Sequence, residues 1–125
     1  MRDEDAAFQQ SRIDMLLDKW VPLCGLENWD MRHFYHRDAP VHGEDGSLTQ
    51  AAVTPHWAYM EARFEWNLAM AESNDDASLE EVVVHELCHC LVDETAGGGD
   101  NEERVVTMLA RAFCRVDRQT EVIGG

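Results

Sequence analysis

The most constraining feature of the chain is a nearly continuous apolar run at residues 82–92, which reads VVVHELCHCLV. Four of its residues follow the i, i+3, i+4, i+7 spacing of a core-facing helix: Val84, Leu87, Cys88 and Leu91. Most other positions in the run are also apolar, so we expect a central, buried helix that ends near residue 93. Ser78 and Glu81 form an S-x-x-E capping box before the run and predict where this helix begins.

Two histidines and a glutamate interrupt this apolar run. His85 and His89 are four residues apart, so on a helix both project from one face and can hold one metal ion together. Glu86 lies on the flank of that face, where its carboxylate can reach a water on the metal. The three residues form HExxH, a pattern typical of helices that bind zinc. Burying them is costly unless a partner such as one Zn²⁺ satisfies them; the alternative is two ordinary histidines beside an unrelated glutamate.

The length and charge of the chain narrow its class. Its 125 residues suit a single domain, 1–125, and no apolar run approaches the roughly 20 residues that span a bilayer. The acidic start, MRDEDAAF, lacks a secretory signal pattern, so we expect a cytoplasmic protein. A formal net charge of −15 disfavours direct binding to nucleic acid or to a membrane, and it favours basic partners or a merely well-solvated surface.

The four cysteines show no paired zinc-ribbon spacing; they are Cys24, Cys88, Cys90 and Cys114. Cys88 and Cys90 are two residues apart on the expected helix and point in different directions, so they cannot chelate a metal together. We therefore expect small buried apolar residues that stay reduced.

The remaining pattern predicts an α+β fold. Residues 5–20 are expected to form a helix with a core stripe of Ile13, Leu16, Leu17 and Trp20, closed by Pro22 and Gly25. Alternating segments at 29–36 and 59–68 and a short segment at 49–54, closed by Pro55, predict three strands. In the segment 59–68 the alternation places five apolar residues on one face: Met60, Ala62, Phe64, Trp66 and Leu68.

The connections complete this arrangement. Residues 37–47 are expected to be a polar loop, 73–77 a turn, and 101–118 a last helix. The core stripe of that helix is expected to be Val106, Leu109, Ala110 and Phe113. Together these elements predict a small, mostly antiparallel three-stranded sheet packed on the central HExxH helix, with one helix before the sheet and one at the end of the chain.

A catalytic zinc usually has a third protein ligand and an open position. The acidic candidates after His89 are Asp93, Glu94, Asp100, Glu102 and Glu103. Asp93 and Glu94 are close to the end of the same helix, where geometry makes it difficult to join the two histidines. Glu102 and Glu103 open the next helix, which can fold back through the Gly-rich turn. The Asp100-x-x-Glu103 pair also fits a simple helix cap.

At this point residues 59–113 resemble the gluzincin zinc peptidases, in which HExxH is followed by a helix that supplies a glutamate. The segment NEERVVTMLARAF at 101–113 is similar to that helix in short phage- and prophage-type and ImmA/IrrE-like peptidases. The resemblance implies a zincin-like fold with His85, His89 and Glu103 as zinc ligands; Glu102 fits the register less well. Thr107 stands where larger gluzincins have an aspartate that supports a histidine. The strand at 59–68 is similar to the edge strand beside a bound peptide.

The expected activity is hydrolysis of peptide bonds in a protein substrate, with Glu86 as general base and the substrate extended along 59–68. Four residues are candidate oxyanion donors: Tyr59, His56, His33 and Tyr35. The alternative is an acidic, non-catalytic binding module, a phage-type regulator or DNA mimic with a structural or lost metal site. A peptidase that cleaves a repressor would share the chemistry of the first interpretation.

Overall fold

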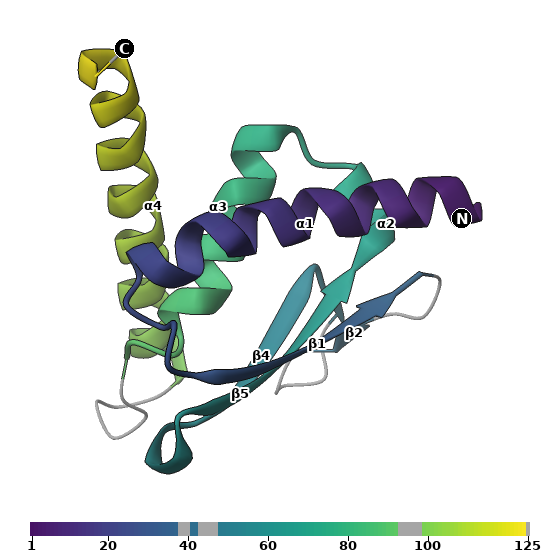
Figure 1. Ribbon diagram of the computed structural model, residues 1–125. Helices are drawn as coiled ribbons and strands as arrows, with labels where there is room; N and C mark the ends of the chain where they lie inside the picture. Colours follow the sequence, from purple (N-terminus) through teal and green to yellow (C-terminus); the bar gives the residue numbers. More distant parts are fainter. Residues whose placement is uncertain (38–40, 43–47, 93–98, 125) are drawn as a thin grey trace.

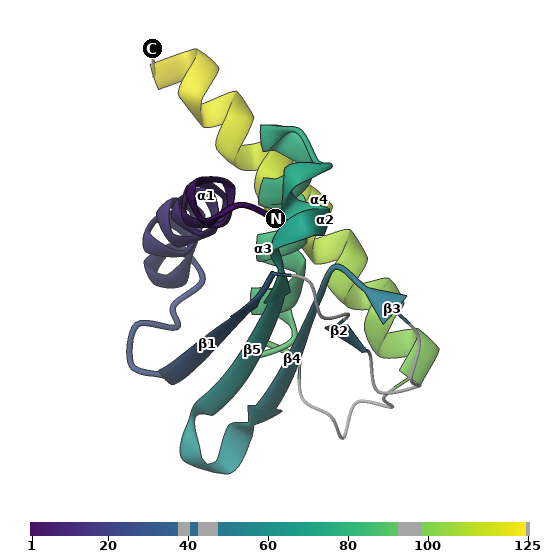
Figure 2. The same cartoon turned by 90° about the vertical axis from the view of Figure 1, so that its right-hand side faces the viewer.

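The computed structural model describes residues 1–37, 41–42, 48–92 and 99–124. They form an α+β arrangement in which helices α1 (Asp3–Leu23) and α3 (Asp76–Cys88) lie over one face of a three-stranded sheet, and α4 (Gly99–Gly124) packs beside α3 (Figure 1). The view turned by 90° shows all the helices on the same side of the sheet (Figure 2). The α+β class is therefore confirmed. Within the described residues, no helix is both long enough and apolar enough to cross a bilayer.

Helix α1 is longer than the pattern predicted, starting at Asp3 and ending at Leu23. Three acidic residues occupy its first turn, where they stabilise the positive end of the helix dipole, so helix begins before the apolar stripe does. Pro22 lies inside the last turn instead of ending the helix, and Gly25 follows with a φ of 73°. The predicted stripe faces the core through Ile13, Leu17 and Trp20, with Leu16 partly buried.

The sheet is mixed, in the order β1-β5-β4, so the prediction of a mostly antiparallel sheet is wrong. Strand β5 (Glu61–Asn67) pairs in parallel with β1 (Asp30–His36) and antiparallel with β4 (Ala51–His56). It is inserted between the two strands that precede it. Alternation of apolar and polar residues tells which face of a strand is buried, but it carries no information on the direction of the neighbouring strand.

The predicted buried face of β5 is confirmed at Ala62, Phe64 and Trp66, while both ends of the segment 59–68 differ from the prediction. Tyr59 belongs to the 3₁₀ helix η1 (Trp57–Tyr59), and Met60 closes that turn in the left-handed region with a φ of 51°. Leu68 begins helix α2 (Leu68–Glu72), which Asn67 caps by accepting a hydrogen bond from the Met70 backbone N–H at 3.2 Å. Local turn and cap chemistry therefore overrides the alternation at the two ends.

Two short strands and a proline also depart from the expected pattern. Strand β2 (Val41–His42) lies in the segment predicted as a loop and pairs antiparallel with β3 (Leu48–Thr49). Pro55 was expected to close a strand, but it lies inside β4. Proline is tolerated there because β4 is at the edge of its sheet.

The central helix α3 is confirmed, but both of its ends differ from the prediction. Its N-cap is Asp75, whose side chain accepts a hydrogen bond from the Ser78 backbone N–H at 2.8 Å, so the helix begins before the predicted Ser78–Glu81 box. It ends at Cys88, and His89 is the C-cap. The backbone N–H groups of residues 89–91 donate three residues back, which is the tighter geometry of a final turn, and Leu91 is exposed.

Helix α4 is fixed against α1 and α3 by packing and by charge. Its fully buried residues are Val106, Ala110 and Cys114, whereas the predicted Leu109 and Phe113 are only partly buried. Lys19 of α1 contacts Glu80 of α3 at 3.0 Å and Asp117 of α4 at 2.8 Å. This three-helix ion network holds the axis of α4 and therefore the position of its first turn.

The four cysteines are free, and three of them are buried. Burial raises the pKa of Cys24 and of Cys114 to about 11, and that of Cys88 and Cys90 to about 12. Thiols with such high pKa values are weak nucleophiles at neutral pH. The expectation that these residues act as small apolar core residues is confirmed for Cys88, Cys90 and Cys114.

Candidate metal centre

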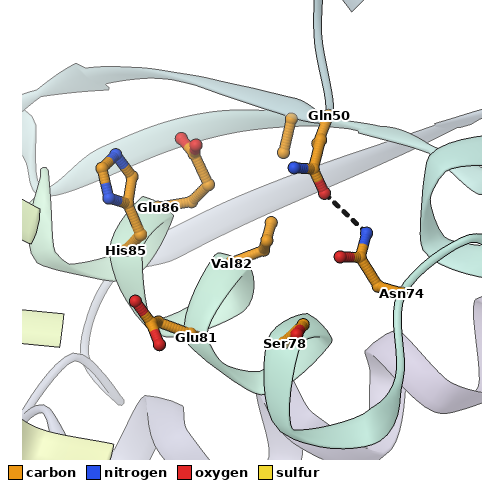
Figure 3. A pocket seen from close by; sticks show the side chains of 8 residues that line it. Gln50, Asn74, Ser78, Glu81, Val82, His85 and Glu86 are labelled. Carbon is orange, nitrogen blue, oxygen red and sulfur yellow. Dashed lines mark hydrogen bonds between the residues drawn. The ribbon is translucent and has the colours of Figure 1, made fainter. Parts of the chain in front are cut away.

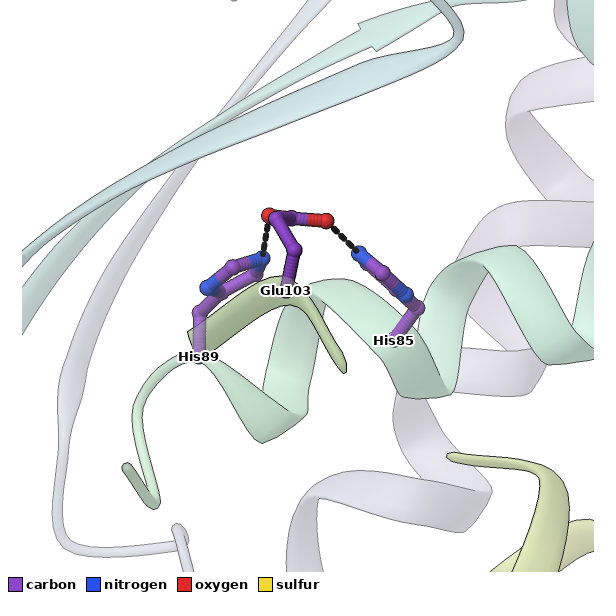
Figure 4. A group of neighbouring side chains, drawn as sticks. All are labelled: His85, His89 and Glu103. Atoms are coloured by element: carbon purple, nitrogen blue, oxygen red, sulfur yellow. Dashed lines mark ion pairs between the residues drawn. The ribbon is translucent and has the colours of Figure 1, made fainter. Parts of the chain in front are cut away.

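Helix α3 presents its two histidines on one face, at the end that leads toward α4 (Figure 4). His85 lies in the last turn and His89 is the C-cap; their ring centroids are 5.1 Å apart and the ring planes are inclined by 71°. The helix ends earlier than predicted, but the two histidines still share one face because the cap residue, His89, keeps right-handed helical dihedral angles. The predicted two-histidine arrangement is present.

Glu103, near the start of α4, lies between the two imidazoles (Figure 4). Its Oε2 is 3.3 Å from His85 Nε2 and its Oε1 is 3.0 Å from His89 Nε2. One potential ligand atom from each of the three residues lies within 4.8 Å of the other two. Ligands bonded to one tetrahedral zinc at about 2.0–2.1 Å lie about 3.3 Å apart, and the two distances from Glu103 to the histidine nitrogens are close to that value.

Glu102 occupies a different place from Glu103. Its Oε1 is 3.0 Å from Nδ1 of His89, the ring nitrogen that faces away from Glu103. A carboxylate at Nδ1 holds the proton on that nitrogen and leaves the lone pair of Nε2 for a metal. The two adjacent glutamates therefore approach opposite nitrogens of one ring, and only Glu103 also reaches His85.

The surroundings of His85 favour its neutral imidazole. Burial lowers the pKa of His85, and the nearby Glu103 carboxylate offsets this only in part. A neutral imidazole offers a lone pair to a metal, whereas an imidazolium does not. The local electrostatics therefore suit a histidine ligand near neutral pH.

Glu86 is buried, with 8 % of its surface exposed, and no described residue donates a hydrogen bond to its carboxylate. In Figure 3 that carboxylate points from α3 toward the sheet, beside His85. Burial, with a further contribution from the Glu103 carboxylate, raises the pKa of Glu86 well above its ordinary value. A buried carboxyl group with a raised pKa is typical of residues that take up and release protons.

A cavity of about 350 Å³ opens beside Glu86, between α3 and the segment that leads into β4 (Figure 3). It is lined by Gln50, Ala51, Asn74, Ser78, Glu81, Val82, His85 and Glu86. Ser78, Glu81 and Val82 lie on one face of α3 before the motif, Asn74 immediately precedes the N-cap of that helix, and Gln50 and Ala51 come from a segment far away in the sequence. No sequence pattern pointed to Gln50, Asn74 or Val82 as site residues, because the cavity exists only once the strand has packed on the helix.

The other acidic candidates and Thr107 add no observed contact to the site. Asp93 and Glu94, and the side chain of Asp100, are outside the described part of the structure. Thr107 makes no hydrogen bond with either histidine in the part of the chain that is described, so it does not replace the supporting aspartate. The support found for His89 comes instead from Glu102.

The four candidate oxyanion donors do not line the cavity. The Tyr35 hydroxyl donates to Asp14 of α1, and Trp66 Nε1 donates to His33 Nδ1 at 3.1 Å, so both side chains serve the packing of the sheet. His56, the last residue of β4, and Tyr59, in the 3₁₀ helix that follows it, are both exposed. The geometry gives no support to an oxyanion role for any of the four.

The strand that was expected to bind the substrate, at 59–68, cannot do so in the structure. Strand β5 has β1 on one side and β4 on the other, so a peptide cannot add to it. The strand that packs on α3 and leads from the cavity wall is the edge strand β4. Trp57, just after β4, donates a hydrogen bond to the Cys90 carbonyl at 3.2 Å and links this strand to the end of the motif.

Comparison of the chain with protein-family models, with curated proteins and with solved structures found no match. The chemistry of the site is therefore inferred from its own geometry.

Proposed function

We propose that the chain is a zinc-dependent metallopeptidase that holds one Zn²⁺ through His85, His89 and Glu103. The observation that carries the proposal is the position of Glu103, whose two carboxylate oxygens lie within 3.3 Å of the Nε2 atoms of both histidines. A simple helix cap would not need to converge on two imidazoles of another helix. Three protein ligands with a fourth open position are the usual composition of a catalytic zinc site.

The site is open enough for a substrate. The Glu103 side chain is 58 % exposed, while His89 is 14 % exposed and Glu86 is buried beside His85. Zinc, when bound, polarises the scissile carbonyl as a Lewis acid and lowers the pKa of a water ligand. The buried side of the centre thus carries the base and the exposed side is left for the peptide.

Glu86 is the general base in this proposal. Its carboxylate has no hydrogen-bond donor among the described residues and lies on the same helix face as His85. A cation held by the neighbouring histidines would favour the ionised form of Glu86, which can take a proton from the attacking water. The same carboxyl group then gives that proton to the departing amine. Because Glu86 is buried, the local dielectric constant is low, and this strengthens the interaction of its carboxylate with a developing charge.

The proposed substrate is a protein or peptide bound in extended form against β4. This edge strand borders α3 and the cavity, whereas β5 is closed on both sides. We further propose that the chain is a minimal zincin-like peptidase of the gluzincin kind, similar to short phage-type and ImmA/IrrE-like enzymes. The order of HExxH helix and glutamate helix, and the packing of α4 along α3, support that relationship.

Metal analysis tests the zinc centre directly. Protein purified without added zinc should carry close to one zinc per chain, and His85→Ala should carry none. Glu86→Gln should keep its zinc and lose peptide hydrolysis by a factor of at least about 100. A metal-free wild type with an unaffected His85→Ala fold would favour an acidic binding module, and a Glu86→Gln protein as active as the wild type would refute the mechanism.

A further inference from the structure

Helix α4 has an apolar strip that faces solvent. Its core-facing residues are Val106, Ala110 and Cys114, which are fully buried. Four other apolar residues follow the i, i+3, i+7, i+11 spacing of a second helix face and are exposed: Val105, Met108, Ala112 and Val116. Met108 and Val116 each expose 60 % of their surface. Exposed apolar side chains that gather on one face are typical of an interaction surface.

A strip of arginines borders the apolar one. Four of the ten lysines and arginines of the chain lie on it, and all four are exposed: Arg104, Arg111, Arg115 and Arg118. Met108 comes four residues after Arg104 and three before Arg111, so the two strips are neighbours on the helix surface. The C-terminal end of α4 also projects beyond the other helices (Figures 1 and 2).

Two of these arginines have no acidic partner in the part of the chain that is described. Arg111 contacts Glu81 of α3 at 3.2 Å, whereas no ion pair among the described residues includes Arg104 or Arg115. Carboxylates for such pairs are abundant, because the chain has 25 acidic residues and 10 lysines and arginines. Arg104 and Arg115 are about three helical turns apart beside the apolar strip, and a partner that brings its own carboxylates can satisfy both.

We propose that this face of α4 is a docking surface for an acidic amphipathic helix of a partner protein. Apolar side chains of that helix pack on Met108 and Val116, and its carboxylates lie beside Arg104 and Arg115. The partner is helical because apolar residues at helical spacing present the ridges and grooves into which a second helix packs. The contact uses neither histidine of the metal centre, so the inference does not depend on the proposed peptidase function.

A second copy of the chain fits this surface less well. In an antiparallel pair of α4 helices the same flank of both helices meets, so the two arginine strips face each other and repel. Both copies also carry a formal net charge of −15, which opposes their association. The complementary charge must therefore come from a different protein.

Methionine methyl groups report on the surface directly. The full-length, metal-free chain is labelled at its methionine methyl carbons and titrated with a synthetic helical peptide of about three heptads, with leucine at the apolar positions and glutamate on the flanks. We expect a saturable shift of the Met108 signal. Met15, which is 70 % exposed on α1, is an internal control and should not shift. The affinity should fall as salt is raised, because exposed charges are screened.

Charge reversal makes the test specific. The double variant Arg104→Glu, Arg115→Glu should bind the glutamate peptide at least about tenfold more weakly, since an exposed ion pair contributes up to about fivefold and repulsion replaces two of them. The same variant should gain a Met108 shift with a peptide that has lysine on its flanks, which should leave Met108 unshifted in the wild type. A double reversal of Arg32 and Arg63, exposed on the sheet, is the charge-matched control and should keep the wild-type affinity.

Several outcomes would overturn the inference. The first is the absence of a saturable Met108 shift at peptide concentrations up to about 1 mM. Equal binding of the glutamate and lysine peptides by the wild type would show an apolar surface without charge selection. A Met108 signal that changes with protein concentration alone would assign the surface to a second copy, and one that changes only with phosphatidylserine vesicles would assign it to a membrane.

Discussion

Glu102 and His89 form the contact that separates the two adjacent glutamates of the centre: Oε1 of Glu102 lies 3.0 Å from Nδ1 of His89. Glu102, which the sequence left as an alternative third ligand, therefore contacts the ring nitrogen that is not directed at Glu103. A hydrogen bond at Nδ1 fixes both the tautomer and the orientation of a metal-binding imidazole. The following glutamate, one residue further along α4, is then free to face both histidines.

Removal of the Glu102 carboxylate should weaken zinc binding without abolishing it. We expect Glu102→Ala to lower zinc affinity by about 10- to 100-fold, because His89 loses the partner that orients its ring. Glu102→Gln retains an acceptor oxygen and should recover part of that loss. Competition with a chromogenic chelator measures both affinities, and an unchanged affinity in Glu102→Ala would show that the contact does not support the metal site.

Replacement of Glu103 should have the larger effect. Glu103→Ala removes the group that bridges His85 and His89, so we expect zinc affinity to fall below that of Glu102→Ala by a further factor of at least about 10. The side chain is largely exposed, so the melting temperature of the metal-free protein should change little. The reverse order of the two affinities would identify Glu102 as the ligand.

The stability of the metal-free protein should depend on Glu86 and on pH. Burial raises the pKa of Glu86 in the folded state, whereas the unfolded carboxyl group has its ordinary pKa near 4.3. Between these two pKa values the folded protein holds a proton that the unfolded chain has released, so its stability falls as pH rises through this window. Glu86→Gln cannot ionise and should lack that fall.

The measurement is urea unfolding of the metal-free wild type and Glu86→Gln from about pH 4 to about pH 8. Relative to the wild type, the free energy of unfolding of Glu86→Gln should rise by about 1.4 kcal/mol for each pH unit between the two pKa values of Glu86. The difference between the two curves cancels other titrating groups that they share, and Glu72→Gln controls for the removal of a charge. If the free energies of unfolding of the wild type and Glu86→Gln had the same pH dependence, burial would not disfavour the ionised form of Glu86.

The start of α3 should depend on Asp75 and not on the Ser78 side chain. Asp75→Ala removes the acceptor for the Ser78 backbone N–H and should lower the free energy of unfolding by about 1 kcal/mol. Ser78→Ala keeps that backbone hydrogen bond, so its effect should be within about 0.5 kcal/mol. Chemical denaturation measures both changes. A larger loss of stability in Ser78→Ala than in Asp75→Ala would indicate that the Ser78–Glu81 capping box starts the helix.

The elements with strong local patterns were predicted correctly in type and less well in extent. The apolar spacing around Val84 and Leu87 identified the central helix, and the alternation at Phe64 and Trp66 identified the buried face of a strand. The ends were decided by single hydrogen bonds at Asp75 and Asn67, which several residues in the neighbourhood could have made. Strand direction was not predictable, because period-two alternation is the same in parallel and antiparallel pairs.

The sequence by itself determined the pair of histidines, since a spacing of four residues on a helix places both on one face whatever surrounds them. It also placed Glu86 beside them. Only the tertiary structure decided which acid joins the pair, because Glu102 and Glu103 differ by about 100° of rotation around α4 and the packing of α4 on α3 selects between them. The cavity of Gln50 and Asn74 arose the same way, from contacts between segments that no local pattern connects.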